Sequence, residues 1–350
     1  MSHAAEKMIE PVGSGEALPR GDRLGAVVIG RNEGDRLPRC LRSILEEVPA
    51  SRIVYVDSGS TDRSVECARA LGVEVHELDP IRPFSAARAR NEGFERLLAA
   101  ADEIELVQFV DGDCEVVRGW FGEASRRLAE RPDLAAVCGR TVERDREASI
   151  YNRLCDIEFD VPAGEAKATG GIFLMRADAY RGVGGMREDV VAGEEPEMGL
   201  RLRRSGWRIE RLARPMVLHD SAMTRFSQWW RRAVRSGVGY SLGAHLHGRS
   251  PDRFCVREVR RFWVWGLLIP LLAIALAWPT WGLSVAAYLL LLATQWSRIA
   301  WRSRRRGLSV ADASIYAVSC VLAKFAGIVG VLRFRRDLAR GRVTGIVEYK

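Results

Sequence analysis

The sequence lacks the marks of several protein classes. Its seven cysteines are scattered without any CxxC spacing, which argues against a zinc site or a disulfide framework and favours a reducing compartment. The first ~20 residues contain no apolar run of the kind that forms a cleavable signal peptide. Acidic residues are scarce in the C-terminal third, because residues 223–350 hold 21 Lys and Arg against 5 Asp and Glu.

This uneven charge indicates the kind of partner to expect. Residues 223–350 carry +16 and residues 1–222 carry −8, so the net charge of +8 conceals two opposite parts. A protein that binds nucleic acid usually has its basic patch on the folded domain. Here the basic residues flank apolar segments, which predicts membrane lipids with anionic head groups as the partner, and no nucleic acid.

Short apolar strands alternate with helices along the first third of the chain. We expect strands at 26–30, 52–56, 73–76 and 104–110, and helices at 35–47, 61–71 and 85–100. This alternation predicts an α/β fold with a doubly wound, mainly parallel sheet. The pattern loosens after residue 133, and a further helix is expected at 194–204. Ligands of such sheets bind beyond the carboxyl ends of the strands.

Two apolar segments near the C-terminus predict a transmembrane helical hairpin. Residues 262–278 and 280–297 contain no charged residue, and each is only slightly shorter than the ~20 residues that cross a ~30 Å hydrocarbon core. Arginines flank the pair on both sides, so both flanks are expected in the cytoplasm and the turn between the segments outside. The alternative is a buried helical hairpin of a soluble protein.

A third apolar segment, residues 308–332, contains Asp312 and Lys324 and is followed by more arginines. We expect it to be re-entrant or to lie in the membrane interface rather than to cross. The chain therefore divides into a flexible lead-in at 1–22, an α/β domain at 23–245 and a C-terminal membrane region at 246–350.

The stretch Asp111-Gly112-Asp113 follows the strand expected at 104–110. On an extended chain, side chains two residues apart point the same way and lie roughly 6.5 Å apart. Two carboxylates at the carboxyl end of a strand suit a hard divalent cation and the phosphates that it carries. The alternative is an Asp-Gly turn that closes a hairpin.

Further motifs follow the other strands and recur later in the chain. They are Asn32-Glu33, the VDSGSTD stretch at 56–62, Arg90-Asn91, Gly193-Glu194-Glu195 and the QWWRR stretch at 228–232. With the DGD motif, they resemble the inverting family 2 glycosyltransferases of GT-A fold over about residues 24–240. With the hairpin that follows, the chain is similar to the membrane-anchored bacterial members of that family that synthesise polysaccharides.

The resemblance implies a binding site for a nucleotide-sugar donor. Asp57 corresponds to the residue that contacts the base, and a carboxylate that accepts a hydrogen bond from the uracil N–H favours uridine. Asp57 could instead cap the following helix, and Arg90 could be an exposed helix residue. The other residues implied in donor binding are Asn32, Glu33, Ser58, Arg90 near the diphosphate, Asp111 and Gly112.

The resemblance also implies a metal site for Mg²⁺ or Mn²⁺. Asp113 would be a direct ligand, and Asp111 would touch the ribose or a metal-bound water. His219 matches the late histidine that often completes the site, and imidazole tolerates Mn²⁺ better than Mg²⁺. The alternative for His219 is a surface histidine after a strand.

The general base is expected at Glu195, where relatives commonly have the Asp of a Glu-Asp pair. Pro196 suits the first helical position, and the positive end of that helix would keep Glu195 ionised. Glu194 is the neighbour with which it could be confused. Glu197 is the alternative without a catalytic role, a carboxylate in the first helical turn.

Acceptor binding is expected at two places. Gln228 and Arg231 resemble the family's QxxRW signature, although position 232 is Arg and the tryptophans come earlier, at Trp229 and Trp230. That departure argues against processive polymerisation, and an amphipathic interfacial helix is the alternative. Gly170 and Gly171 match the glycine pair near the donor sugar and the acceptor, although a plain turn is the other interpretation.

These features predict a metal-dependent inverting glycosyltransferase at the cytoplasmic face of the inner membrane. It would transfer a sugar from a nucleotide-diphosphate donor, a UDP-sugar in the first instance, to a lipid-linked or growing glycan in cell-envelope or exopolysaccharide synthesis. One hairpin is too little membrane for an export channel, so export or polymerase proteins are expected as partners. A catalytically silent scaffold of a polysaccharide assembly is the alternative, and a sugar-1-phosphate nucleotidyltransferase is disfavoured because the loop at 30–34 is acidic and poor in glycine.

Overall fold

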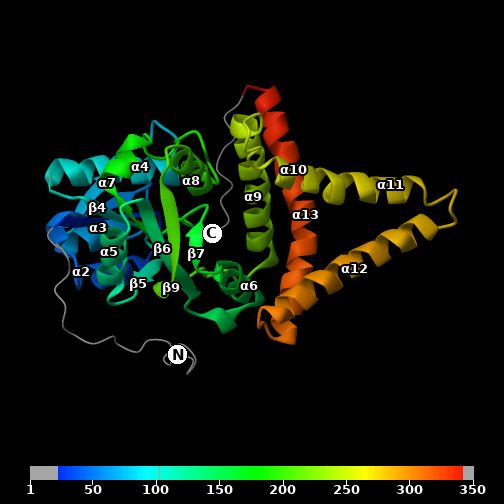
Figure 1. Cartoon of the computed structure of the whole chain (residues 1–350), viewed down its shortest axis with the longest axis horizontal. Coiled ribbons are helices and arrows are strands. Elements are labelled where there is room, and N and C mark those ends of the chain that lie inside the picture. Colours follow the sequence, from blue (N-terminus) through cyan, green and yellow to red (C-terminus); the bar gives the residue numbers. More distant parts are fainter. Residues whose placement is uncertain (1–22, 102, 342–350) are drawn as a thin grey trace.

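A computed structural model describes residues 23–101 and 103–341 of the chain. The lead-in expected at 1–22 lies outside the described residues. The described part consists of an α/β domain, a long helix pair beside it and a helical hairpin that projects away (Figure 1).

The first half of the sheet is parallel, as the alternating pattern predicts. Its four strands are ordered β3-β2-β1-β4, with β1 at Leu24–Gly30, β2 at Ile53–Asp57, β3 at Glu74–Glu77 and β4 at Leu106–Asp111. Helices α2 (Arg36–Leu45), α3 (Ser64–Ala70) and α4 (Ala86–Ala100) connect them. Register places Gly30 beside Asp57 and Ile29 beside Asp111. The loops after β1, β2 and β4 therefore meet at one edge of the sheet.

The second half makes the sheet mixed rather than mainly parallel. Strand β8 (Phe173–Arg176) is antiparallel to both β4 and β6 (Leu134–Glu143). Strand β9 (Arg208–His219) is parallel to β6 and antiparallel to β5 (Cys114–Val116) and β7 (Gly164–Ala166). Both Cys114 and Glu143 are register partners of His219. Residues more than seventy positions apart are thus brought to one place.

Four helices complete the α/β domain: α5 at Trp120–Glu130, α6 at Ile150–Phe159, α7 at Ala177–Gly182 and α8 at Glu194–Arg204, with short 3-10 turns at Ala50–Arg52 and Arg146–Ala148. The bounds of α8 agree with those expected from the sequence. The core lies between the sheet and these helices, and the buried Trp120 is satisfied there because its Nε1 donates to Gln108 Oε1 over 2.9 Å.

The C-terminal helices form two groups. In Figure 1, α9 (Phe226–His247) stands between the sheet and α13 (Val310–Ala339), which runs alongside it. Helix α10 (Val256–Trp263), a π-helical turn (Val264–Leu268) and α11 (Ile269–Ala275) form the outgoing arm of a hairpin, and α12 (Leu283–Arg305) forms the returning arm.

Two helices of the described part are long and apolar enough to cross a membrane. They are α12, with a mean hydropathy of 1.2, and α13, with 2.1. None of the apolar window of α12 is buried within the molecule, whereas 39% of that of α13 is. The returning arm is longer than the 280–297 expected from the sequence, because the helix continues through the arginines to Arg305.

The third apolar segment differs from its re-entrant interpretation. Helix α13 continues without a break for 30 residues, so the chain does not reverse its direction there. Near the start of α13, Asp312 faces the α/β domain. The Asp312 carboxylate accepts hydrogen bonds from Arg146 Nη2 and Arg153 Nη2, each over 2.7 Å. Glycines let α13 approach α9 closely, since a Cβ on Gly237 would lie 2.2 Å from the carbonyl oxygen of Gly327.

Candidate active site

One cavity of about 880 Å³ opens at the carboxyl edge of the sheet. Its lining includes the loop after β1, the loop before α4, the end of β4, the start of α8, His219, and one face of α9. The volume is near the upper end of the ~300–1,000 Å³ typical of ligand pockets. The residues that line it among those expected from the sequence are Asn32, Glu33, Ser58, Arg90, Asp111, Asp113, Glu194, Glu195 and His219.

The buried side chain of Asp57 stabilises the loop after β2 by hydrogen bonds. Its side chain is 1% exposed. The carboxylate accepts hydrogen bonds from Tyr55 Oη (2.8 Å), Gly59 N (3.0 Å), Ser60 N (2.7 Å) and Ser60 Oγ (2.5 Å). Asp57 itself does not line the cavity, whereas its neighbour Ser58 does.

Asn32 joins the first two loops. It adopts a left-handed conformation with φ of 55°, which asparagine tolerates better than most residues. Its Oδ1 accepts from Thr61 N over 2.7 Å, and its own N donates to Ser60 Oγ over 2.9 Å. The loops after β1 and β2 therefore form one rigid wall of the cavity.

Phe84 was not singled out by the sequence. It lines the cavity beside Ser58 and packs over Gly59, where an added Cβ would lie 2.9 Å from the Phe84 ring. The Arg31 guanidinium lies 5.8 Å from the ring centroid. An aromatic face at this wall suits the stacking of a nucleobase.

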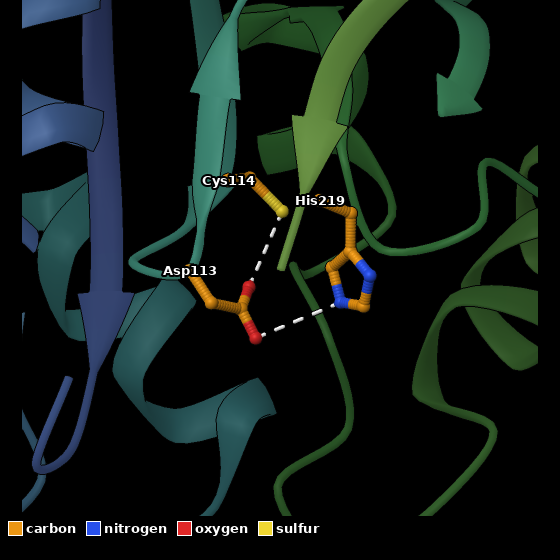
Figure 2. A group of neighbouring side chains, drawn as sticks. All are labelled: Asp113, Cys114 and His219. Atoms are coloured by element: carbon orange, nitrogen blue, oxygen red, sulfur yellow. Dashed lines mark hydrogen bonds and ion pairs between the residues drawn. The ribbon is translucent and has the colours of Figure 1, made fainter. Parts of the chain in front are cut away.

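The best donor group for a metal in the described residues consists of Asp113, Cys114 and His219, whose ligand atoms all lie within 4.8 Å of one another (Figure 2). His219 Nε2 lies 3.6 Å from Asp113 Oδ2. On the other side of the ring, Nδ1 lies 2.8 Å from Glu143 Oε2. That pairing favours the tautomer with the proton on Nδ1, so the Nε2 lone pair faces Asp113.

These residues fit a hard divalent cation through a carboxylate and an imidazole. Burial and the neighbouring Asp113 raise the pKa of the Cys114 thiol well above its ordinary value, and a protonated thiol is a poor ligand for Mg²⁺ or Mn²⁺. Asp113 and His219 are therefore the residues that could hold such an ion. Glu143, whose side chain is fully buried, orients His219 and was not found from the sequence.

Arg90 binds two carboxylates of the site, those of Asp111 and Glu194. Its guanidinium is 2% exposed, so it is not the surface residue that the sequence left open. It donates from Nη2 to Asp111 Oδ1 (2.8 Å) and to Gly171 O (3.1 Å), and from Nη1 to Glu194 Oε1 (3.4 Å). Although burial opposes its charge, Asp111, Glu195 and Glu194 together raise the pKa of Arg90.

Glu195 is the more exposed member of the glutamate pair at the start of α8, and both members line the cavity. Burial and the charge of Glu194 raise the pKa of Glu195 to about 7, against the lowering effect of Arg90. A carboxylate with this pKa can accept a proton near neutral pH and is a better base than an ordinary glutamate.

Gly171 lies beside Glu195 and Asp111. Gly170 and Gly171 have φ of 83° and 93°, a conformation that favours glycine. A Cβ at Gly171 would lie 3.0 Å from Glu195 Oε1 and 3.6 Å from Asp111 Oδ2. The absence of a side chain therefore lets these carboxylates lie close to the backbone, and neither glycine is among the residues that line the cavity.

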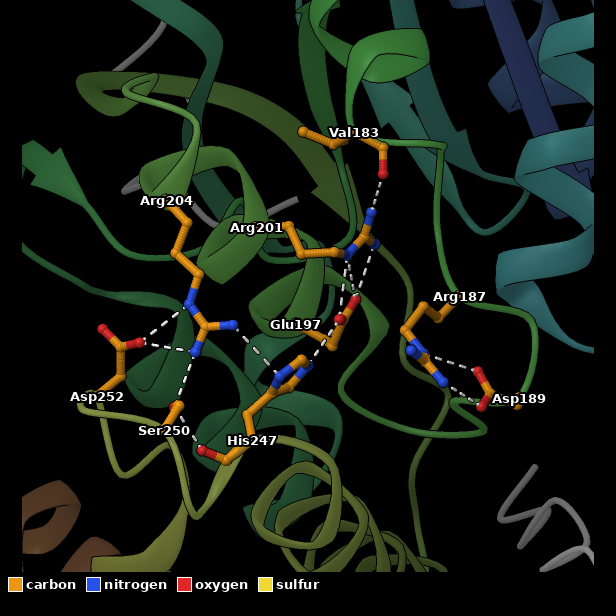
Figure 3. A network of polar contacts seen from close by, with 9 residues as sticks. All are labelled: Val183, Arg187, Asp189, Glu197, Arg201, Arg204, His247, Ser250 and Asp252. Atoms are coloured by element: carbon orange, nitrogen blue, oxygen red, sulfur yellow. Dashed lines mark hydrogen bonds and ion pairs between the residues drawn. The ribbon is translucent and has the colours of Figure 1, made fainter.

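Glu197 has a structural role in the network of Figure 3. Its carboxylate is 1% exposed and accepts from Arg201 Nε (2.9 Å) and Nη2 (2.8 Å), and His247 Nε2 lies 2.9 Å away. It therefore ties α8 to the C-terminal end of α9. Arg204 adds a second tie to Asp252 over 2.7 Å.

The QWWRR stretch does not reach the cavity with the residues expected from the sequence. Gln228 Oε1 accepts from the backbone N of Thr224 and Arg225, both over 2.9 Å, and so caps α9. Trp229 and Trp230 pack in a cluster with residues of α6 and α13, and Arg231 is exposed. The part of α9 that lines the cavity consists instead of Arg232, Arg235, Ser236, Gly239 and Tyr240.

The chain is similar to known proteins in sequence and in fold. Residues 26–180 match the family described as glycosyl transferase family 2. The chain is 26% identical over 226 residues to the pre-mycofactocin glycosyltransferase of Mycobacterium tuberculosis, which covers 61% of this chain and 46% of that protein. It is 22% identical over 286 residues to the O-antigen chain rhamnosyltransferase WbaN of Salmonella anatum, covering 73% of this chain and 89% of that protein. The chain thus spans less than half the length of the mycofactocin relatives.

Among solved structures, the chain resembles the mannosyltransferase PcManGT from Pyrobaculum calidifontis, determined with GDP-Man and Mn²⁺. The TM-score is 0.54 at 20% identity, over 89% of this chain and 87% of that one. This similarity concerns the fold. The α/β domain of this chain therefore has the GT-A fold and, over residues 26–180, matches the family 2 glycosyltransferases.

Proposed function

We propose that the chain is an inverting, metal-dependent glycosyltransferase that transfers a sugar from a nucleotide-diphosphate donor to a lipid-linked or growing glycan. The observation that carries the proposal is the single cavity, which joins the β1 and β2 loops, the Asp113–His219 pair and Glu195. A nucleotide, a diphosphate and an acceptor hydroxyl each have a matching wall in that cavity.

The donor is proposed to bind along the sheet edge. Its base would lie beside Phe84 and the loop that Asp57 holds, and its diphosphate would extend toward Asp113 and His219. We propose a UDP-sugar first, and GDP-sugars are the competitor to test because a fold relative is known with GDP-Man. A Mg²⁺ or Mn²⁺ held by Asp113 and His219 would neutralise the charge that develops on the departing diphosphate.

The protein's own groups are proposed to perform the proton transfer. Glu195 accepts the proton of the acceptor hydroxyl as its oxygen attacks the anomeric carbon from the side opposite the diphosphate, which inverts the configuration. Arg90 holds Asp111 and Glu194 in place beneath the sugar site.

The membrane setting is part of the proposal. The apolar arm α12 supports anchoring, and the cytosol supplies nucleotide sugars, so the catalytic domain is proposed at the cytoplasmic face of the inner membrane. Cell-envelope or exopolysaccharide synthesis is the proposed process, with export left to partner proteins. A relative named as an O-antigen rhamnosyltransferase supports that direction.

The test is calorimetric titration of UDP and GDP into detergent-purified protein, with and without Mn²⁺. We expect Mn²⁺-dependent binding of UDP that is lost in Asp113→Asn. The matched control is Asp133→Asn, the same change at an exposed aspartate outside the cavity, and it should bind as the parent does. If the folded parent protein binds neither nucleotide, the donor site does not function and a silent scaffold is the better interpretation.

A further inference from the structure

The first turn of α13 is joined to the α/β domain by ion pairs. The Asp312 carboxylate accepts hydrogen bonds from Arg146 Nη2 (2.7 Å) on one oxygen and from Arg153 Nε (3.1 Å) and Nη2 (2.7 Å) on the other. Asp312 is only 7% exposed, so removing its charge would leave both guanidiniums short of a counter-charge in a partly buried place. The helix does not need this carboxylate as a cap, because Ser309 Oγ already accepts from Asp312 N over 3.0 Å.

Arg146 extends this contact toward the metal site. Its Nε donates to Asp156 Oδ2 of α6 over 3.1 Å. The other oxygen, Asp156 Oδ1, accepts from the backbone N of Glu143 at the end of β6 over 3.3 Å. Glu143 in turn pairs with His219 Nδ1 over 2.8 Å. An unbroken series of polar contacts therefore connects α13 to the imidazole.

Helix α6 makes a second connection, through apolar side chains. Leu154 of α6 and Tyr316 of α13 belong to one hydrophobic cluster. Phe159, the last residue of α6, is a member of the same cluster, and its ring meets the His219 ring edge-on with the centroids 5.4 Å apart. A displacement of α6 relative to α13 would therefore move two neighbours of the imidazole, Glu143 and Phe159.

The other end of α13 provides a comparison. Asp337 is as buried as Asp312, at 7% exposure. Its carboxylate pairs within the helix, with Arg336 over 2.9 Å and with Arg333 over 4.0 Å. A general stabilisation of α13 would depend on both aspartates, whereas the connection to the metal site runs through Asp312.

We propose that Asp312 is a positioning residue for the metal site. By holding Arg146 and α6 in place, it keeps Glu143 against the Nδ1 side of His219, so that Nε2 stays aimed at Asp113. The inference rests on the proposed function, because it concerns the residues that would hold the divalent cation. It makes the apolar helix α13 a structural part of the donor site as well as a candidate membrane anchor.

The first test is calorimetric titration of Mn²⁺ into the full chain in neutral detergent. We expect Asp312→Asn and Arg146→Gln each to lower the Mn²⁺ affinity about tenfold, the lower end of the effect of losing a group that supports a metal ligand. If both residues act by one route, the double variant should lose less affinity than the two single losses combined. Asp337→Asn is the matched control, the same change at equal burial in the same helix. Its affinity should stay within about twofold of the parent's, because distant sites act independently.

A second measurement does not depend on bound metal. The chain is isotope-labelled at its histidine nitrogens, and the His219 signals in the NMR spectrum are assigned by their absence in His219→Gln. At alkaline pH the imidazole is neutral, and we expect the parent to show the Nδ1–H tautomer that Glu143 favours. The signals of the two ring nitrogens should move closer together in Asp312→Asn and stay in place in Asp337→Asn.

Unchanged Mn²⁺ affinity and unchanged ring signals in Asp312→Asn would overturn the proposal. Equal effects in Asp337→Asn would also overturn it, because they would indicate a general effect on α13. If Asp312→Asn does not fold, Arg146→Gln decides, since it keeps the pair between Asp312 and Arg153. A parent chain that binds no Mn²⁺ would contradict the proposed function, and the ring signals alone would then decide whether Asp312 positions His219.

Discussion

At the residue scale, Glu194 and Glu195 are neighbours in the chain with unequal surroundings. Glu194 is nearly buried, and its Oε1 lies 3.4 Å from Arg90 Nη1, so its charge is compensated. Glu195 is partly exposed and lines the cavity. Burial and the charge of Glu194 raise its pKa to about 7, and Arg90 lowers it. The arrangement separates a carboxylate that supports the site from one that can exchange a proton.

A pH profile distinguishes the two roles. Because a base must be ionised to act, we expect kcat/KM of the parent to fall as the pH drops through about 7. Glu194→Gln removes a charge that raises the pKa of Glu195. In this variant we therefore expect the acidic limb of the kcat/KM profile to move to lower pH, with activity retained. Glu195→Gln should lower kcat by roughly 10²–10⁴ at every pH. An acidic limb that does not move in Glu194→Gln, or a larger loss there than in Glu195→Gln, would reverse the assignment.

Glu143 gives a second prediction at this scale, for a positioning residue. One of its oxygens accepts from Ser221 N over 3.0 Å, and the other pairs with His219 Nδ1 over 2.8 Å. In Glu143→Gln an amide NH₂ must face one of these two N–H donors, so His219 loses its orientation. We expect Mn²⁺ affinity to fall about 10–100-fold in calorimetry.

The control for Glu143 is Glu115→Gln on β5, because Glu115 pairs with Arg144 rather than with the histidine. Thermal unfolding of both variants would report any loss of folding separately. Unchanged Mn²⁺ affinity in a folded Glu143→Gln would show that His219 needs no such support, or binds no metal.

At the element scale, local signals predicted helices and strands better than they predicted which side chains meet. Pro196 and Gly206 bracket α8, and its bounds follow from them. Strand β4 and Asp113 also follow from an apolar run and its end. Glu143 lies 76 residues before His219, and only the β6–β9 register joins them. Nothing local marks such a pairing, so it could not be predicted from one sequence.

Helix α9 is a second case in which the sequence predicted the element but not which of its side chains reach the site. The QWWRR stretch is recognisable, but which of its residues reaches the cavity depends on how α9 packs. Trp229 lies in a cluster with residues of α6 and α13, whereas Arg232, one turn further along α9, lines the cavity. The motif located the right helix but not the residues of it that line the cavity.

The tight contact between α9 and α13 gives the third prediction. A Cβ at Gly237 would lie 2.2 Å from the Gly327 carbonyl oxygen, which is backbone and cannot rotate away. Gly237→Ala should therefore lower the free energy of unfolding by about 1–3 kcal/mol, the cost of overpacking. Gly182→Ala at the end of α7 is the control, because an added Cβ there has no neighbour within 4 Å. Equal unfolding midpoints in detergent would mean that the two helices are not packed this closely.

At the scale of the whole molecule, charge and shape together indicate how the chain meets a membrane. The basic excess of residues 223–350 surrounds a hairpin that projects from the rest (Figure 1). At the end of α12, Arg306 Nη2 donates to the carbonyl oxygen of Asp160 over 2.8 Å, so the returning arm ends on the α/β domain. At the far end, Trp278 and Trp281 are 93% and 95% exposed.

The topology gives the last prediction. If the hairpin crosses the membrane, its tip lies on the side opposite the catalytic domain, and the arginine-rich flanks stay in the cytoplasm. Trp278→Cys should then be labelled by a membrane-impermeant maleimide in intact spheroplasts of a bacterial expression host. Arg302→Cys, exposed near the end of α12, should be labelled only after lysis, and the parent chain gives the background from its native cysteines.

The opposite pattern would place the donor site outside, away from the nucleotide sugars of the cytosol. Labelling of both positions only after lysis would mean that the hairpin does not cross. In that case the arms would lie along the membrane surface rather than through it, and a lipid-linked acceptor would have to enter the cavity from that surface.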